Sequence, residues 1–434
     1  MLATTLARIA AVLTAVVRTI IGGLQRNARL PGVRVVLQHW LRERRTLQQG
    51  FSALSIGVGI TLLAGVILGA MDRLLAELPG LLMLAPAAIG MRGAIFGALG
   101  ARLGTGMLTG QLDGSYARTS FEGQNVQAAA VLSAITAVVL AAITKGVAAM
   151  LGLGVIAFTD LVVVSMLGTI LSSVAVLLVV VVLVRTAQRQ SWDMDAIGTP
   201  IISATADITT LPALALATLA IGNASVSAVL GWASVVGAVL IALVGLRSRA
   251  DLARRVVRES LPILLYAAGM GVMAGTVLEA RKDALISSAA LLVAVPPFIA
   301  SSGAIGGILS ARLASHLHLG LIQPRVVPDR PVWLEASMTL LLSVLAYLSV
   351  GLLTFAASAA LGYDSPPLAT LVGITVTAGL LAVSMIVAVA YYAATASFRF
   401  GLDPDNVGIP LVTSTMDFAG ILCLVAGITA FGAG

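Results

Sequence analysis

Two segments bounded by aspartates carry the residue types that could bind a cation inside a membrane. They run from Asp193 to Asp207 and from Asp403 to Asp417, and six of their fifteen positions are identical. The marked positions recur at intervals of three and four residues, which places them on one face of an α-helix. The polar stripe so defined contains Asp193, Pro200, Ser203 and Asp207 in the first segment, and Asp403, Asn406, Pro410, Thr413 and Asp417 in the second.

The spacing predicts one carboxylate at a helix end and one deep in the bilayer, because fourteen helical residues rise about 21 Å. An aspartate at the bilayer centre costs about 3 kcal/mol, so Asp207 and Asp417 should face the protein interior and have a partner. We expect this pair to bind a cation, with Asp193 and Asp403 at the cytoplasmic mouth of its path. The expected lining of the ion path is Ser203, Thr205, Thr413, Thr415 and Asn406, with carbonyls freed by Pro200 and Pro410.

Other interpretations of the buried charges stay open at this point. Asp207 could form a salt bridge with Lys145. The residue 210 positions after Lys145 is Phe355, so Asp417 would have no corresponding lysine. Either aspartate could also be protonated and bonded to a neighbouring backbone. Arg102 and Arg312 lie near helix ends, where snorkelling to the interface is the structural interpretation and a gate is the functional one.

The composition indicates that these residues lie in a lipid bilayer. Hydrophobic residues make up 59% of the 434 residues and charged residues 10%, whereas a soluble chain has about 25% charged residues. A single cysteine and three histidines argue against a zinc-type site. No catalytic constellation stands out, so we predict that the protein is not an enzyme.

Eleven segments are long and apolar enough to span a membrane, which predicts an all-α polytopic membrane protein. The expected spans are 51–70, 81–108, 126–152, 161–184, 197–221, 225–246, 261–280, 287–314, 332–360, 367–394 and 407–431.

An internal repeat with an offset of 210 residues organises these spans. Gly93–Gly110 and Gly303–Gly320 share nine of eighteen positions, and the aspartate segments match at the same offset. Closer to the start of each repeat, three further positions match at the same offset: Gly59, Ala64 and Gly65 correspond to Gly269, Ala274 and Gly275. The predicted organisation is a basic amphipathic segment (1–50), a five-helix repeat (51–222), a linker helix with a basic loop (223–260) and a second five-helix repeat (261–434).

The number of spans and the arginine-rich loops predict the orientation. The extra helix makes the two repeats parallel, with a pseudo-two-fold axis along the membrane normal. Eight arginines and one glutamate in residues 1–45 place the N-terminus in the cytoplasm and the C-terminus outside the cell membrane. This basic segment lacks interleaved aromatics, so we expect it to contact membrane lipids and no nucleic acid.

Paired aspartates and hydroxyls suit a hydrated Mg²⁺, which keeps several waters while contacting one or two carboxylates. Mn²⁺ and Co²⁺ stay open. A secondary transporter of a small organic solute is the main alternative, but it needs aromatic or guanidinium contacts that are scarce here. An intramembrane aspartyl protease is a minor alternative suggested by Tyr363-Asp364, although the second half of that motif is absent.

The segment Asp403-Pro-Asp-Asn-Val-Gly-Ile-Pro through Asp417 resembles the MgtE family of magnesium channels and the related vertebrate magnesium solute carriers. The glycine-rich stretch Gly303–Arg312 resembles the family's second helix. The resemblance implies that two five-helix halves form one pore, so that one chain suffices, and that Asp207 and Asp417 are its central aspartates. Arg92 departs from the pattern by adding a charge in one copy only.

We predict that reporter fusions at residue 253 read cytoplasmic and fusions at residue 434 read external. The arginine-rich loops and the odd number of spans require this result. Substituted-cysteine labelling from each side of the membrane is the check, and a cytoplasmic C-terminus would contradict the parallel arrangement of the repeats.

Overall fold

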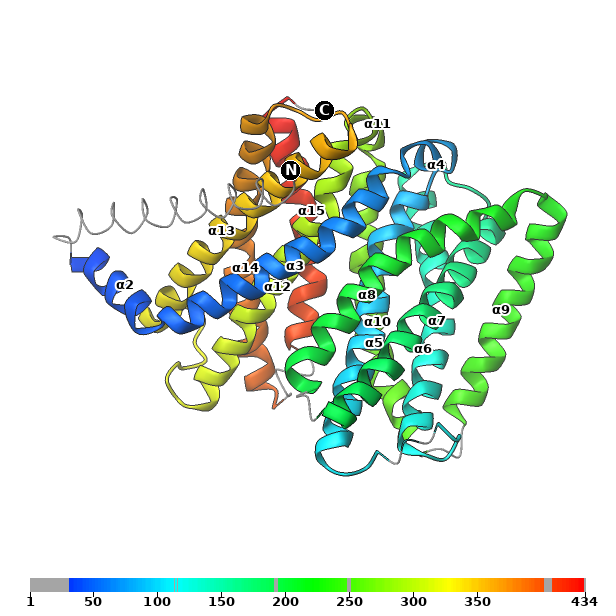
Figure 1. Cartoon of the computed structure of the whole chain (residues 1–434), viewed down its shortest axis with the longest axis horizontal. Coiled ribbons are helices and arrows are strands. Elements are labelled where there is room, and N and C mark those ends of the chain that lie inside the picture. Colours follow the sequence, from blue (N-terminus) through cyan, green and yellow to red (C-terminus); the bar gives the residue numbers. More distant parts are fainter. Residues whose placement is uncertain are drawn as a thin grey trace. The chain divides into compact units, whose positions relative to one another are not determined.

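The computed structural model describes residues 31–112, 114, 116–190, 194–247, 251–401 and 408–432, which fold into helices without a strand (Figure 1). Eleven of the described helices are long and apolar enough to cross a membrane, which confirms the predicted polytopic all-α class. The helices are α2 (Pro31–Arg42), α3 (Arg44–Gly69), α4 (Asp72–Glu77), α5 (Leu81–Leu108), α6 (Phe121–Leu151), α7 (Phe158–Gln190), α8 (Met194–Ala217), η1 (Thr218–Ile221), α9 (Ala224–Leu246), α10 (Asp251–Glu279), α11 (Lys282–Ile286), α12 (Ala289–His318), α13 (Arg330–Leu361), α14 (Leu368–Arg399) and α15 (Ile409–Ala430).

The 210-residue offset of the sequence reappears in the helix boundaries. Helix α6 ends at Leu151 and α13 at Leu361, and the residue after each helix is a glycine with positive φ. These residues, Gly152 and Gly362, have φ values of 67° and 71°. A left-handed C-cap favours glycine because a side chain there would be strained. The duplication therefore extends to the local conformation that ends each helix.

The chain forms two compact units, and neither coincides with one sequence repeat. Unit 1 combines the described residues up to Gly69 with those from Asp283 onward, and unit 2 runs from Ala70 to Lys282. Unit 1 therefore contains α3 together with α12 to α15, and unit 2 contains α5 to α10. The first span of each repeat belongs to the unit formed by the later spans of the other repeat.

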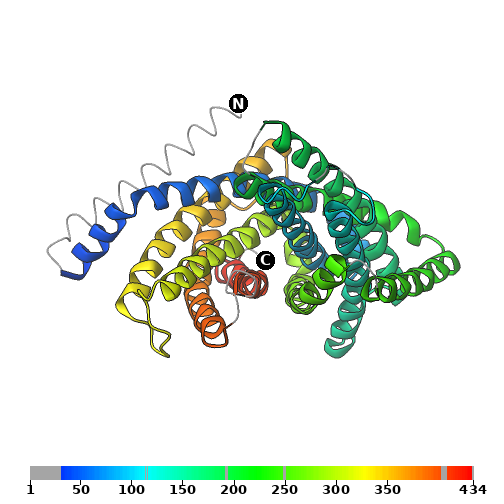
Figure 2. The same ribbon diagram turned by 90° about the horizontal axis from the view of Figure 1, so that it is seen from below.

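Glycines allow this exchange of first spans. Helix α3 lies along α12 and α13 in unit 1 (Figures 1 and 2), and a Cβ at Gly65 would lie 2.1 Å from the carbonyl oxygen of Val293 in α12. In unit 2, a Cβ at Gly275 of α10 would lie 2.2 Å from the carbonyl oxygen of Met83 in α5. Such backbone-to-backbone packing through small residues is how helices associate in lipid, where apolar burial gives little driving force.

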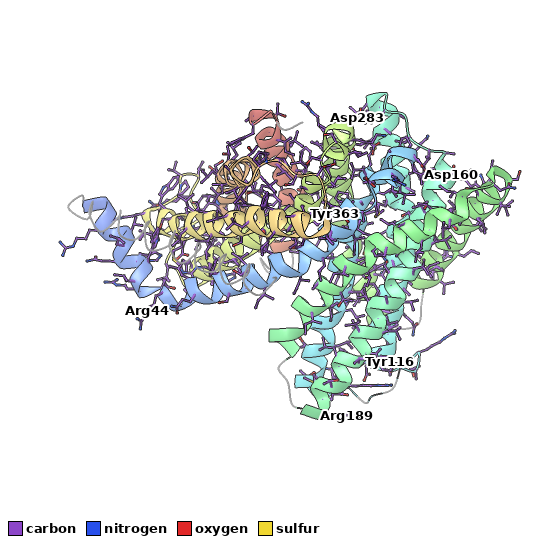
Figure 3. All side chains as sticks on the ribbon, turned by 45° about the horizontal axis from the view of Figure 1, so that its top comes forward. Arg44, Tyr116, Asp160, Arg189, Asp283 and Tyr363 are labelled. Atoms are coloured by element: carbon purple, nitrogen blue, oxygen red, sulfur yellow. The ribbon has the colours of Figure 1, made fainter. Side chains whose placement is uncertain are left out.

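Helix α9 has no counterpart in the second repeat and joins the two repeats along the chain. It packs on α7, where the Ser227 hydroxyl donates to the Asp160 carboxylate at the start of that helix (Figure 3 labels Asp160). A Cβ at Gly231 would lie 2.8 Å from Thr159, so this contact is also close. Much of the rest of α9 is an exposed apolar surface, including Trp232, as expected of a helix that faces lipid.

We predict that Gly65→Ala and Gly275→Ala each lower the apparent melting temperature in detergent. The added methyl group meets a backbone carbonyl that cannot move alone, and overpacking of this kind costs about 1–3 kcal/mol. Gly59→Ala and Gly269→Ala are the matched controls, because a Cβ at either position meets nothing within 4 Å. Alanine favours a helix over glycine by about 1 kcal/mol, so the controls should be neutral or stabilising. Equal behaviour of all four variants would contradict the exchanged packing.

Candidate ion-binding stripes

The two aspartates that were expected to lie deep in the bilayer occupy equivalent positions of α8 and α15. Asp207 in unit 2 and Asp417 in unit 1 are both half-buried. The other expected ligands of the stripes, Asp193, Asp403 and Asn406, fall outside the described residues, and Pro200 and Ser203 are described only as part of the α8 backbone. Among the described residues, no group of three or more His, Cys, Asp or Glu side chains could hold a metal ion.

The Asp417 carboxylate faces Gly303 of α12 at an ordinary contact distance. A Cβ at Gly303 would lie 3.8 Å from Asp417 Oδ1 and 3.8 Å from Thr413 Cβ. Further along, Gly306 faces Val412, so residue numbers rise on α12 as they fall on α15 and the helices are antiparallel. Asp417 and Thr413 thus face the glycine-rich part of α12 that the sequence comparison singled out.

The threonines that were expected to line the ion path donate their hydroxyl hydrogens to their own helices. Thr205 donates to Ile201 O at 2.8 Å, Thr415 to Leu411 O at 2.6 Å, and Thr413 to Pro410 O at 3.2 Å. A hydroxyl oxygen keeps two lone pairs after its hydrogen is used in this way. These oxygens can therefore accept hydrogen bonds from the water shell of a cation.

Pro410 lies in the first turn of α15. The N–H of a residue in the first turn has no intrahelical partner, so proline is tolerated there without the loss of a helical hydrogen bond. Pro410 therefore fits the start of α15, whereas its counterpart Pro200 lies in the interior of α8. The freed carbonyl at either proline stays a prediction.

Lys145 does not pair with Asp207. Its ammonium group donates to the carbonyl oxygens of Val155 and Ile156, at 3.4 and 3.0 Å, in the connection after α6. Among the residues that the structure describes, nothing forms a hydrogen bond or an ion pair with the Asp207 carboxylate. The salt-bridge interpretation of Asp207 therefore has no support in the contacts of Lys145.

The equivalent arginines of α5 and α12 each bind the next helix. Arg102 Nε donates to Asn125 Oδ1 of α6 at 2.7 Å. Arg312 donates to both carboxylate oxygens of Glu335 in α13, from Nε at 2.6 Å and from Nη2 at 2.9 Å. Asn125 and Glu335 are themselves 210 residues apart. The sequence analysis missed these partners, although two polar residues inside apolar helices at the repeat offset were a usable signal.

The surface helix α2 joins the ion pair of unit 1. Arg312 Nη2 also lies 3.4 Å from Glu43, and His39 Nε2 lies 3.6 Å from Glu335 Oε1. Trp40 Nε1 donates to Ser337 Oγ at 3.1 Å. These contacts tie the helix before the first span to α13. In unit 2, the residue equivalent to Glu43 is Ala253, so Arg102 has no such second acid.

A second set of charges lies at one end of unit 2, where Figure 3 labels Tyr116 and Arg189 together. Burial raises the pKa of the Tyr116 hydroxyl, while the nearby Arg185 lowers it and Glu122 raises it. Glu122 Oε1 accepts from the Gly114 amide at 2.9 Å. This carboxylate holds the connection between α5 and α6 against the start of α6.

A family model described as MgtE, divalent cation transporter, matches residues 85–217 and 295–427. Both ends of the second match lie 210 residues after those of the first, which confirms the tandem duplication. The matches contain Asp207 and Asp417 and extend over most of α5 to α8 and α12 to α15. No curated protein and no solved structure matches the chain significantly.

We predict that Glu335→Gln destabilises the protein by on the order of 2 kcal/mol, because it leaves Arg312 without its bidentate acid. Breaking a fully buried pair costs about 3–5 kcal/mol, and the partial exposure of Arg312 reduces this cost. Asp329→Asn is the control, since its pair with the exposed Arg325 at 3.5 Å is worth about 0–1 kcal/mol. Thermal unfolding in detergent gives the comparison, and a larger effect at Asp329 would contradict the assignment.

Proposed function

Because the chain belongs to the MgtE family of divalent cation transporters, we propose that it conducts hydrated Mg²⁺ along the polar faces of α8 and α15. Asp207 and Asp417 are the paired ligands in this proposal. The observation that carries it is a carboxylate at the same place in each family-matched segment. The family gives no support to an organic-solute transporter or to a protease.

The chemistry of the stripes favours an ion that keeps its water. Each described stripe offers one carboxylate, and the stripe of α15 adds the hydroxyl oxygen of Thr413, whose hydrogen is already donated to the helix. Mg²⁺ loses its waters reluctantly and is usually bound by one or two carboxylates. Carboxylates supply charge to the dication, and the threonine oxygens accept hydrogen bonds from its waters.

The membrane potential is sufficient to drive the ion inward. A dication that crosses 100 mV gains about 4.6 kcal/mol, twice the value for a single charge. The deep site should bind only moderately, because an ion that is held too tightly does not leave. Asp193 and Asp403 would raise the local cation concentration at the cytoplasmic mouth. Both copies belong to one chain, so a single chain suffices for this path.

We predict that Asp207→Asn and Asp417→Asn each reduce Mg²⁺ uptake into liposomes and that the double variant abolishes it. Each substitution removes one negative charge from the ion path while keeping the size of the side chain. A fluorescent Mg²⁺ indicator inside the vesicles gives the rate, and Mn²⁺ and Co²⁺ in parallel give the selectivity.

Asp283→Asn is the matched control, because this carboxylate is exposed in the segment before α12 and lies outside both stripes. It should transport at the wild-type rate. Normal transport by the double aspartate variant would overturn the proposed function, provided that its melting temperature matches that of the wild type.

A further inference from the structure

Helix α2 is held against unit 1 by polar side chains on one of its faces. His39 Nε2 lies 3.6 Å from Glu335 Oε1. Trp40 Nε1 donates to Ser337 Oγ at 3.1 Å. At Glu43 the chain turns out of the direction of α3, so that α2 leaves the line of the first span (Figure 1). The contacts of α2 therefore fix which of its faces is turned toward the protein.

The opposite face of α2 is exposed and basic. This outward face consists of Arg34, Gln38, Leu41 and Arg42, all of them exposed and spaced so that they lie on one side of a helix. Leu41, next to the second arginine, is 66% exposed. Arginines beside an apolar side chain are typical of a helix that lies in the headgroup region of a membrane.

No acid offsets the charge of the outward face. Glu43 is the only acid in residues 1–71, and its carboxylate lies 3.4 Å from Nη2 of Arg312, on the side of the protein. Among the residues that the structure describes, none forms an ion pair with Arg34 or Arg42. Both arginines therefore present their full positive charge to a partner outside the chain.

The equivalent stretch of the second repeat, at the start of α10, pairs its arginines with acids. Arg254 Nη2 lies 2.5 Å from Asp251 Oδ1. Arg255 Nε lies 2.7 Å from Glu259 Oε1. Both acids are exposed, so the two pairs lie on the surface of unit 2 and lower the net charge of that surface.

The first repeat lacks these two acids. The residues 210 positions before Asp251 and Glu259 are Leu41 and Gln49, whereas the two arginines between them are kept. Leu41 and Asp251 are both exposed, so the packing of the spans does not explain the difference. One copy of the stretch has a surface of paired charges, and the other has a basic surface with an exposed leucine.

Helix α2 lies close enough to the hydrocarbon core of a bilayer to reach the lipid headgroups. It ends at Arg42, and the first apolar span begins at Gly50. A helix rises about 12 Å over that interval, and the headgroup region on each side of the core is about 5–7 Å thick. Arginine has a long apolar stem, which lets its charged end extend across the remaining distance.

We propose that the outward face of α2 docks on the headgroups of anionic phospholipids. The guanidinium groups of Arg34 and Arg42 bind phosphate oxygens in bidentate pairs, and Leu41 enters the apolar boundary below them. The sequence predicts that α2 is cytoplasmic, and the cytoplasmic leaflet has the negative surface potential that attracts basic side chains. The inference narrows the lipid contact expected from the sequence to one helix face and one class of lipid. It does not depend on the proposed function.

The first test measures the dissociation constant of a fluorescent phosphatidylglycerol for the purified full chain in neutral detergent. The salt concentration is about 0.15 M, at which charges more than about 8 Å apart are screened. Arg34→Gln with Arg42→Gln should raise the dissociation constant about 25-fold, because each basic residue near an anionic surface contributes about fivefold. Arg34→Lys with Arg42→Lys keeps both charges and should stay within about twofold of the wild type.

Unit 2 provides the matched control. Arg254→Gln with Arg255→Gln removes the same number of charges from the equivalent stretch, where acids already offset them, and should change the dissociation constant less than about twofold. Leu41→Asp places the acid of the second repeat in α2 and should weaken binding about fivefold, as the loss of one arginine does. All of these side chains but Arg254 are exposed, and an unchanged melting temperature shows that each variant is folded.

An equal loss of binding in the α2 and α10 variants would overturn the inference, because the protein would then respond to net charge alone. Equal binding of phosphatidylcholine would overturn it too, because that lipid has no net charge. Full competition by inorganic phosphate at the concentration of the lipid would show a site for free phosphate and no docking on a membrane. Failure of the proposed function is a separate outcome, because Mg²⁺ uptake by the aspartate variants measures it and the outward face stays intact in them.

Discussion

The architecture depends on the approach of two backbones at a glycine, because helices in lipid gain little from burying apolar side chains. Gly65 lets α3 contact the carbonyl of Val293, and Gly275 lets α10 contact the carbonyl of Met83. Each contact joins the first span of one repeat to the second span of the other. The glycine-rich helix that carries Gly303 beside Asp417 is therefore also the helix that holds the exchanged span. The close packing of α3 and the contact with Asp417 therefore both involve α12 of unit 1.

Because the first spans are exchanged, a sequence repeat and a compact structural unit contain different sets of helices. A five-helix repeat that kept its own first span could fold as a self-contained bundle. Here each compact unit takes a helix from the other repeat, so neither repeat completes a unit alone. A tandem chain supplies both exchanged helices at a fixed ratio.

The sequence predicted the class of fold, the eleven spans and the repeat because hydropathy and a constant 210-residue offset are properties of the chain alone. It could not show the exchange of α3 and α10. The match between Gly65 and Gly275 in the repeat does not indicate which helix each glycine contacts. The partners of Arg102 and Arg312 were missed because Asn125 and Glu335 differ in type. The resemblance to MgtE proteins indicated the family and singled out Asp207 and Asp417. The carbonyl partners of Lys145 became visible only in the structure. The roles of Asp207 and Asp417 stay predictions.

Duplication within one chain allows the two copies to diverge, and the polar contacts show where they have done so. Arg312 has two acids and a surface helix around it, whereas Arg102 has a neutral amide. Arg92 carries a charge where Ser302 and Tyr347 form a neutral pair. A homodimer of identical halves cannot diverge in this way, because every substitution appears twice. A fused chain can instead hold different charges and different polar partners at equivalent positions of its two halves.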